Sequence, residues 1–190
     1  MFDHASAAIP AGARADVAPE ASSLEREVVA LFDQLRDRLL RYVISMGLLV
    51  PDAEEIIQEA FLALFRHLQQ GKPRYNLRAW LFQVAHNLAL KQYLRGRRDR
   101  DNVAQYGGTS AGDFFVDHTP NPEAQISRRE RESRLFGVWE ALPELDQRCL
   151  SLRAEGLTYR EISQVLEISL GSVAISLARS LERFARADGR

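Results

Sequence analysis

The chain has 190 residues, of which 46% are hydrophobic and 27% are charged, and its formal net charge is −1. This balance predicts a folded soluble protein with one domain or two small ones. The one cysteine, Cys149, excludes an internal disulfide framework, and its apolar neighbours predict a buried thiol in a reducing compartment.

No stretch is long and apolar enough to span a membrane, and the N-terminus lacks the pattern of a secretory signal. We therefore expect a cytoplasmic protein without membrane insertion, in which residues 1–21 form a flexible tail.

Apolar residues recur at helical spacing along most of the chain, which predicts an all-α fold. A capping-box pattern at Ser22 and Glu25 starts a first helix that ends near Gly47, and Asp52 is expected to cap a second helix. Residues 71–76 interrupt the pattern at Pro73, and a third helix follows. These helices form a predicted module over residues 22–98.

Residues 99–124 are rich in Gly, Pro and polar residues and predict a flexible linker. A second module covers residues 125–190. In it a helix over about residues 146–155 ends at Gly156, and Thr158 with Glu161 forms a capping box. A short helix then runs to about residue 166, and Ser169 caps the last helix.

Charge is unevenly distributed along the chain. Residues 1–60 hold five Arg and eleven acids, residues 72–100 hold eight cations and one acid, and residues 101–155 hold six Arg and ten acids. This segregation predicts one basic surface on an otherwise acidic molecule, although a solvated helix face would give the same pattern.

The end of the chain has the pattern of a helix, a short turn and a second helix. Ile162 and Val165 on the first helix would face Val173 and Leu177 on the second. This is helix-turn-helix spacing, in which the second helix enters the DNA major groove. Helical hairpins that do not bind DNA share the pattern, so it leaves both interpretations open.

Two blocks of the sequence resemble a known family. Residues 52–61 and 80–89 resemble region two of extracytoplasmic-function (ECF) RNA polymerase sigma factors, and residues 142–143, 156–162 and 171–173 resemble their region four. The resemblance implies a non-enzymatic, DNA-binding subunit that directs polymerase to promoters.

The resemblance also implies that the second helix docks on the clamp helices of core RNA polymerase. The positions that carry this role are Asp52, Glu55, Gln58, Glu59 and Leu62. Without the resemblance, a solvated acidic face would be the favoured interpretation.

The loop before the third helix and that helix itself are implied to open the minus-ten element and hold a flipped base. The corresponding positions are Lys72, Arg74, Tyr75, Asn76, Arg78, Asn87, Lys91 and Arg95. Opening DNA requires a basic track and a surface for an unstacked base. Trp80 fits either the core or the base site, and Asn87 either an internal hydrogen bond or DNA.

The last helix is implied to read the minus-thirty-five element. Its candidate contacts, together with one residue of the preceding helix, are Arg160, Ser169, Gly171, Ser172, Ala174, Ile175, Ser176, Arg179 and Arg183. The family usually has cations at Ala174 and Ser176, Gly at Glu167 and Ala at Ser163. A left-handed Glu167 would cost about 1 kcal/mol, and the missing cations predict weak or unusual DNA recognition.

Other functions were compared with this interpretation. The four His residues show no metal-ligand spacing and no nucleophile or phosphate-loop motif is present, so we expect no enzyme and no cofactor. A sigma-like decoy that binds an anti-sigma factor fits the weakly basic last helix but not the basic residues 72–100. An ordinary helix-turn-helix regulator leaves residues 52–61 and 80–87 unexplained. An anti-sigma partner is expected from the resemblance alone.

Overall fold

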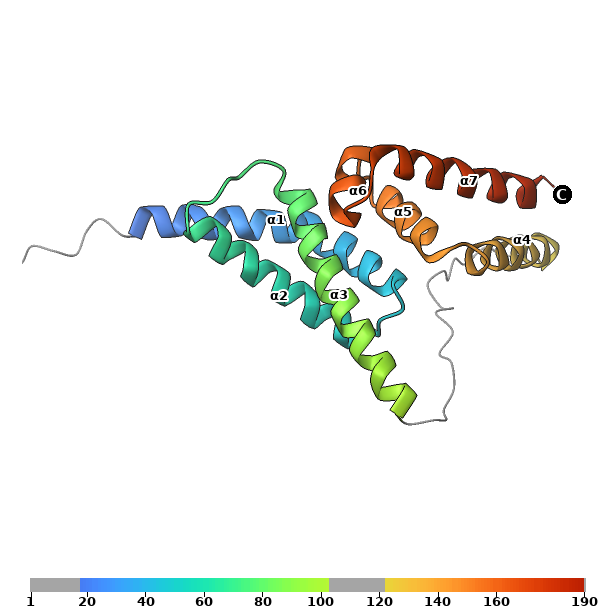
Figure 1. Cartoon of the computed structure of the whole chain (residues 1–190), viewed down its shortest axis with the longest axis horizontal. Coiled ribbons are helices and arrows are strands. Elements are labelled where there is room, and N and C mark those ends of the chain that lie inside the picture. Colours follow the sequence, from blue (N-terminus) through green and yellow to red (C-terminus); the bar gives the residue numbers. More distant parts are fainter. Residues whose placement is uncertain (1–17, 103–121, 190) are drawn as a thin grey trace, which may run out of the picture.

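A computed structural model describes residues 18–102 and 122–189, and every regular element in these ranges is an α-helix (Figure 1). The predicted all-α fold is thereby confirmed. The helices are, in chain order, α1 (Ala18–Ser45), α2 (Val50–Gln69), α3 (Leu77–Asn102), α4 (Pro122–Glu140), α5 (Glu144–Ala154), α6 (Tyr159–Leu166) and α7 (Leu170–Asp188).

The first three helices pack on one another, with α3 contacting both α1 and α2. Their core consists of residues with the predicted helical spacing, and Leu39, Leu64 and Leu81 have no exposed surface. Each such side chain stabilises the fold by roughly 1.5–3 kcal/mol relative to exposure. Inside this core, the Tyr42 hydroxyl lies 2.7 Å from Nδ1 of His86 and so ties α1 to α3.

Two predicted helix starts are wrong. α1 begins at Ala18, so Ser22 lies within the helix and is not its N-cap. α2 begins at Val50, and its N-cap is Leu49, whose side chain has no hydrogen-bond acceptor. Pro51 lies in the first turn, where its missing N–H is not needed. Asp52 instead lies in the first turn, where a carboxylate suits the positive end of the helix.

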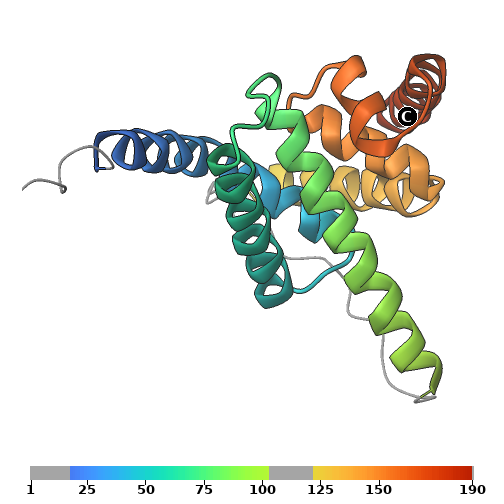
Figure 2. The same cartoon turned by 60° about the vertical axis from the view of Figure 1, so that its left-hand side comes forward.

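The second group of helices consists of α5, α6 and α7, with α4 packed alongside α7 (Figure 2). Its core includes Leu152, Ile162, Val165 and Leu177. Cys149 is fully buried here, as predicted, and burial raises the pKa of its thiol.

The two groups are packed together. α3 contacts α6 and α1 contacts α5, and the buried apolar residues of both groups form one continuous cluster. Helical backbone occupies residues 99–102 and 122–124 of the predicted linker, while residues 103–121, like residues 1–17 of the predicted tail, lie outside the described residues.

Within the described ranges, no helix by itself has the length and apolarity to cross a membrane, although α6 and α7, bent by 108°, pass that test as a pair.

Candidate nucleic-acid and polymerase interfaces

The outer face of α2 carries the predicted acidic surface. Glu55, Gln58, Glu59 and Leu62 are exposed, whereas Asp52 is half-buried. The opposite side of α2 is buried against α1 and α3. None of the four exposed side chains forms a hydrogen bond or an ion pair with another described residue, and Leu62 is 56% exposed. This face is therefore free to meet a basic partner.

The loop between α2 and α3 holds several of the predicted minus-ten residues. Lys72 is exposed, and Arg74 forms an ion pair of 2.8 Å with Glu27 of α1. Tyr75 is 82% exposed. The Nε2 of His67 donates to the Pro73 carbonyl at 2.9 Å, which fixes the loop against the end of α2.

A cavity of about 440 Å³ lies beside this loop, with Tyr75, Asn76 and Trp80 among its lining residues. Trp80 contributes to the core and also lines this cavity. It is half-buried and packs on the core, while its ring lies 4.6 Å from the His67 ring at the cavity wall. An aromatic lining of this kind suits an unstacked base.

One face of α3 carries the rest of the minus-ten candidates. Asn87, Lys91 and Arg95 are exposed and follow one another at four-residue spacing, so they share a face of the helix. None of them forms a hydrogen bond or an ion pair within the described part of the chain. Asn87 therefore does not form, within the described part of the chain, the internal hydrogen bond that was one of its two predicted roles.

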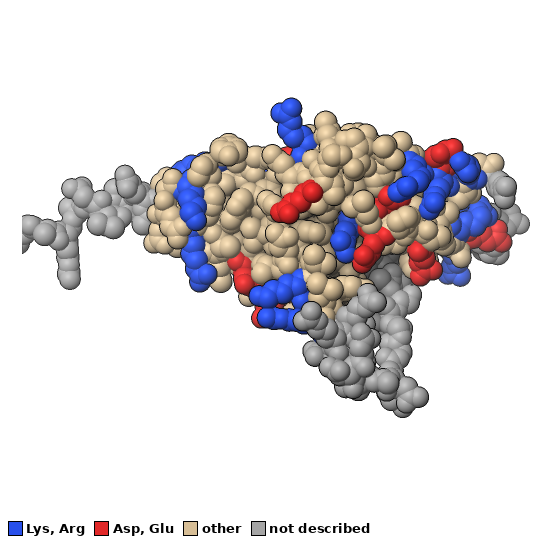
Figure 3. All heavy atoms as spheres, in the orientation of Figure 1, with Lys and Arg blue, Asp and Glu red and all other residues tan. Residues whose placement is uncertain are grey.

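Basic side chains occupy several separate places on one face of the molecule (Figure 3). On the face shown in Figure 3, Lys and Arg side chains are separated by uncharged surface, and at the α4–α7 end they alternate with Asp and Glu. The side chains of residues 97–100 lie outside the described part.

The remaining minus-ten candidates contact the second group of helices. Asn76 has a left-handed backbone (φ 55°), and its side-chain amide donates to Gln164 of α6 at 2.8 Å. Arg78 donates through one Nη to the backbone carbonyl of Glu155 at 3.0 Å, while its buried Nε has no partner among the described residues. Gln83 donates to Glu167 at 3.2 Å.

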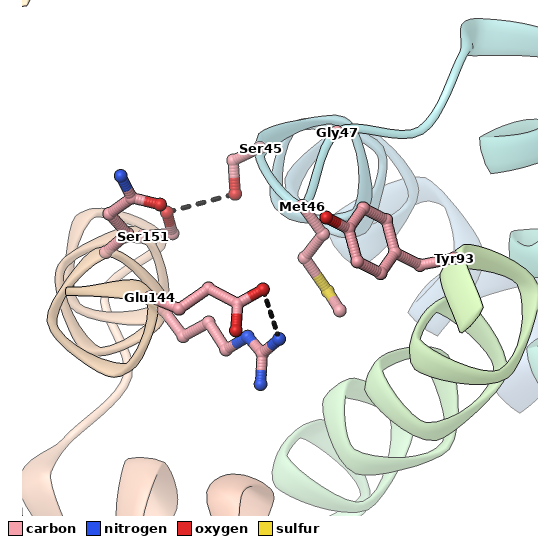
Figure 4. A pocket seen from close by; sticks show the side chains of 8 residues that line it. Ser45, Met46, Gly47, Tyr93, Glu144 and Ser151 are labelled. Carbon is pink, nitrogen blue, oxygen red and sulfur yellow. Dashed lines mark hydrogen bonds and ion pairs between the residues drawn. The ribbon is translucent and has the colours of Figure 1, made fainter. Parts of the chain in front are cut away.

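A bidentate ion pair completes the contact between the two groups. Arg41 of α1 donates to both carboxylate oxygens of Glu155, at 2.9 and 2.7 Å. This interaction raises the pKa of Arg41. Nearby, Ser45 of α1 donates to Ser151 of α5 at 3.0 Å, at the edge of a cavity of about 240 Å³ that Tyr93 also lines (Figure 4).

α6 and α7 have helix-turn-helix geometry. The angle of 108° between them lies in the range of the motif. The predicted capping box is confirmed, since Glu161 N–H donates to Thr158 and Thr158 N–H donates back to the Glu161 carboxylate at 2.8 Å. Glu167 adopts the predicted left-handed conformation (φ 55°), and Ser163 donates to the Ile168 carbonyl across the turn at 2.5 Å.

The N-terminus of α7 is capped as predicted, because Ser169 accepts from the backbone N–H of Ser172 at 3.0 Å. Of the minus-thirty-five candidates, Ala174 is half-buried, and those exposed are Arg160, Ser169, Gly171, Ser172, Ile175, Arg179 and Arg183.

Ser176 does not lie on the outer surface. It is 2% exposed and donates to the buried carboxylate of Asp146 in α5, so it is removed from the candidate DNA contacts. Arg179 binds the same carboxylate through two hydrogen bonds, of 2.9 and 2.7 Å. Burial alone would raise the pKa of Asp146, but the hydrogen bonds from Arg179 and Ser176 outweigh it and lower that pKa.

Comparison with known proteins identifies this arrangement. The sigma-70 region 2 family matches residues 31–99, and the sigma-70 region 4 family matches residues 139–184. The RNA polymerase sigma-H factor of Pseudomonas aeruginosa is 31% identical over 140 residues, which are 72% of each chain. This chain belongs to the sigma-70 family, in its ECF group.

Other relatives agree with this membership. The ECF RNA polymerase sigma-E factor of Escherichia coli K12 is 30% identical over 138 residues, which cover 69% of this chain and 71% of the relative.

Two solved structures share the fold. Sigma factor RpoE from Bartonella quintana, in complex with the anti-sigma factor NepR, has a TM-score of 0.62 at 17% identity, over 87% of this chain and 96% of that one. CnrH in complex with the cytosolic domain of CnrY has a TM-score of 0.55 at 20% identity, over 87% of this chain and 90% of that one.

Membership of the sigma-70 family gives the two groups of helices their names. α1–α3 carry region 2, and α5–α7 with the end of α4 carry region 4. The ECF chain therefore has the regions that direct RNA polymerase to promoters.

Sequence reasoning missed the residues that join the regions and those that fix α7. Arg41, Glu155 and Gln164 appear in the sequence as ordinary polar residues on helix surfaces. Asp146 was visible only as an acid near a helix start. Ser176 had one detectable signal, because it has the same helical spacing as the buried Val173 and Ser180.

Proposed function

We propose that this ECF sigma factor, which directs RNA polymerase to specific promoters, does so through three separate surfaces. The outer face of α2 binds the clamp helices of core polymerase, the loop before α3 and the exposed face of α3 open the minus-ten element, and the start of α7 reads the minus-thirty-five element. The observation that carries the proposal is the presence of both sigma-70 regions, in order, in one chain.

The α2 surface is supported by its unpaired acids. Glu55 and Glu59 make no ion pair with described residues, although carboxylates on this helix can do so, as Glu54 does with Arg36 at 3.1 Å. Exposed Leu62 adds apolar area among them. An acidic rim around an exposed leucine is a common composition for a docking face with a basic partner.

The minus-ten surface is supported by unpaired cations next to an aromatic cavity. Lys72, Lys91 and Arg95 are exposed and unpaired among the described residues, so they are available to neutralise phosphates. Tyr75 and Trp80 line the adjacent cavity and can stack on a base.

The free chain cannot use this cavity fully as it stands. Asn76, Arg78 and Gln83 are all hydrogen-bonded to region 4, and Gln164 of α6 lines the cavity. The proposed function therefore includes a separation of regions 2 and 4 when the chain joins polymerase and promoter.

An anti-sigma factor is a further proposed partner. It is supported by the solved structure of RpoE with NepR, which has the same fold as this chain. A protein that holds regions 2 and 4 together would keep Asn76 and Arg78 bound to region 4. The proposed activity is one of binding without catalysis, and it takes place with polymerase in the cytoplasm.

Run-off transcription with purified core polymerase tests the proposal. Promoters are obtained by selecting transcribed fragments from the source genome. Glu55→Lys/Glu59→Lys is expected to abolish core binding in gel filtration. Glu130→Lys/Glu140→Lys changes two exposed acids of α4, so it alters the net charge by the same amount and should bind normally.

The minus-ten surface is tested by Lys91→Ala/Arg95→Ala. This variant should bind core polymerase but open promoters poorly, and the salt dependence of promoter binding should fall by about one unit of slope per lost phosphate contact. Wild-type protein that fails to bind core polymerase would overturn the proposal and favour the decoy.

A further inference from the structure

The outer face of α7 is unusually apolar for a helix that is expected to contact DNA. Gly171, Ile175 and Ala178 follow one another at spacings of four and three, so they lie on one face, and all are exposed. Ile175 is 65% exposed, more than any other large aliphatic side chain in the described ranges. Its exposure has no explanation in the packing of this chain.

The buried side of the helix already has its own apolar residues. Val173 and Leu177 are 0% and 1% exposed and pack in the region 4 core. Ile175 lies on the opposite side, so it is not a displaced core residue.

The arginines of α7 do not add free positive charge to its outer face. Arg179 binds Asp146 of α5, Arg186 forms an ion pair with Glu182, and Arg183 donates to the Ala141 carbonyl at 3.4 Å. What α7 presents outward in its first turns is therefore small or apolar, and Ile175 is the most exposed of its large apolar side chains.

Gly171 provides space next to Ile175. A Cβ at this position would meet no atom closer than the Ser169 hydroxyl, at 3.8 Å, so internal packing does not require glycine here. The missing side chain, together with the short side chain of Ala178, allows another molecule to approach the helix closely around Ile175.

The start of α7 is also equipped for a DNA backbone. The hydroxyls of Ser169 and Ser172 lie 2.8 Å apart at the helix N-terminus, where backbone N–H groups favour phosphate. In a helix-turn-helix the first turns of the second helix face base edges. The apolar group that the major groove presents is the C5-methyl of thymine.

We infer that Ile175 contacts the methyl group of a thymine in the minus-thirty-five element, and that this contact gives the promoter part of its specificity. The inference rests on the proposed function, because it requires α7 to lie in the major groove. An apolar contact of this kind also explains how the recognition helix can bind DNA although its outer face lacks free cations.

Replacing thymine by deoxyuridine tests the inference, because the change removes the methyl group and leaves the hydrogen-bonding edge intact. The minus-thirty-five element is first defined by selection from a randomised duplex with the holoenzyme. Each thymine is then replaced singly, and the dissociation constant is measured at fixed salt. At one position, replacing thymine by deoxyuridine is expected to lower the affinity of the holoenzyme about fourfold, which is the factor for one buried methyl group.

The same substitution is repeated with two variants. Ile175→Ala should bind thymine and deoxyuridine equally at that position, because the contacting side chain is gone. Leu181→Ala removes another exposed apolar side chain, 57% exposed and on a different side of the helix, and should keep the fourfold difference. Both positions are exposed, so neither change should disturb folding.

Three results would overturn the inference: a selected element without thymine, no thymine that responds to deoxyuridine, or an undiminished response in Ile175→Ala. If Ile175→Ala instead weakens capture of a protein partner while deoxyuridine has no effect, the face belongs to that partner. Failure of the proposed function looks different, since the wild-type holoenzyme would then give no promoter-specific transcript on unmodified templates.

Discussion

Removing the ion pair between regions 2 and 4 should raise the affinity of the free chain for single-stranded minus-ten DNA. The perturbation is Arg41→Ala, which removes both hydrogen bonds to Glu155. Asn76, Arg78 and Gln83 are bound to region 4 in the closed arrangement, so weakening that arrangement makes them available.

The magnitude follows from the exposure of the two partners. Glu155 is 9% exposed at its side chain but Arg41 is 61% exposed, so solvent screens much of the attraction. Exposed ion pairs contribute up to about 1 kcal/mol, and we take that upper value because the contact is bidentate. A change of about 1 kcal/mol multiplies the ratio of open to closed chains about fivefold.

The affinity should rise by up to the same factor, because a ligand that binds a minor state gains in proportion to its population. The assay is fluorescence anisotropy with a labelled minus-ten oligonucleotide at fixed salt. The direction of the change in affinity is diagnostic, because the loss of a cation would by itself weaken binding to the phosphates of the oligonucleotide. Small-angle scattering should show a larger radius of gyration for the variant.

A matched control is Arg36→Ala, which breaks the ion pair with Glu54 inside region 2 and does not touch region 4. It should leave the affinity and the radius unchanged. An affinity for Arg41→Ala that equals or falls below wild type would refute the reasoning.

Three further predictions concern stability. Burial, with a smaller contribution from Arg148, lowers the pKa of His86 to about 4 from 6.5. As the pH falls, His86 is therefore protonated in the unfolded chain at a higher pH than in the folded chain. The free energy of unfolding should fall by about 3 kcal/mol as the pH drops from 6.5 to 4. In urea unfolding, His86→Gln should show a weaker dependence of this free energy on pH over the same range. Asp146→Asn should lower the free energy of unfolding by about 2 kcal/mol, because Arg179 and Ser176 lose their charged partner, and unchanged urea stability would count against this. Glu167→Gly should raise the melting temperature, since glycine relieves about 1 kcal/mol of left-handed strain; a lower melting temperature would show that the hydrogen bond from Gln83 matters more.

Local features were the ones that the sequence allowed us to predict. The capping box at Thr158 and the cap at Ser169 depend on residues three positions apart, and Glu167 occupies a turn whose length forces a left-handed residue. Such features depend on neighbours along the chain, so the pattern of residues can indicate them. The same pattern at Ser22 and Glu25 was misleading, because α1 already begins at Ala18.

Features that depend on distant partners could not be predicted. Arg41 and Glu155 are 114 positions apart, and nothing in either neighbourhood indicates the other. Ser176 was assigned to the DNA surface because the family resemblance places it on the recognition helix. Asp146, 30 positions away, supplies the acceptor that makes its burial favourable. A polar residue at core spacing is ambiguous until its partner is known.

The closed arrangement covers some of the residues proposed to contact DNA and leaves others accessible, so the proposed function includes an order of events at a promoter. Lys72, Lys91 and Arg95 are exposed, and so is the outer face of α2. Polymerase and phosphates can therefore engage the closed chain. Asn76 and Arg78 are held by region 4, so the contact with a base that we propose for them requires the regions to separate first. Because the contacts that hold the regions together include polar ones at partly exposed positions, binding energy from polymerase can offset their loss without unfolding either core.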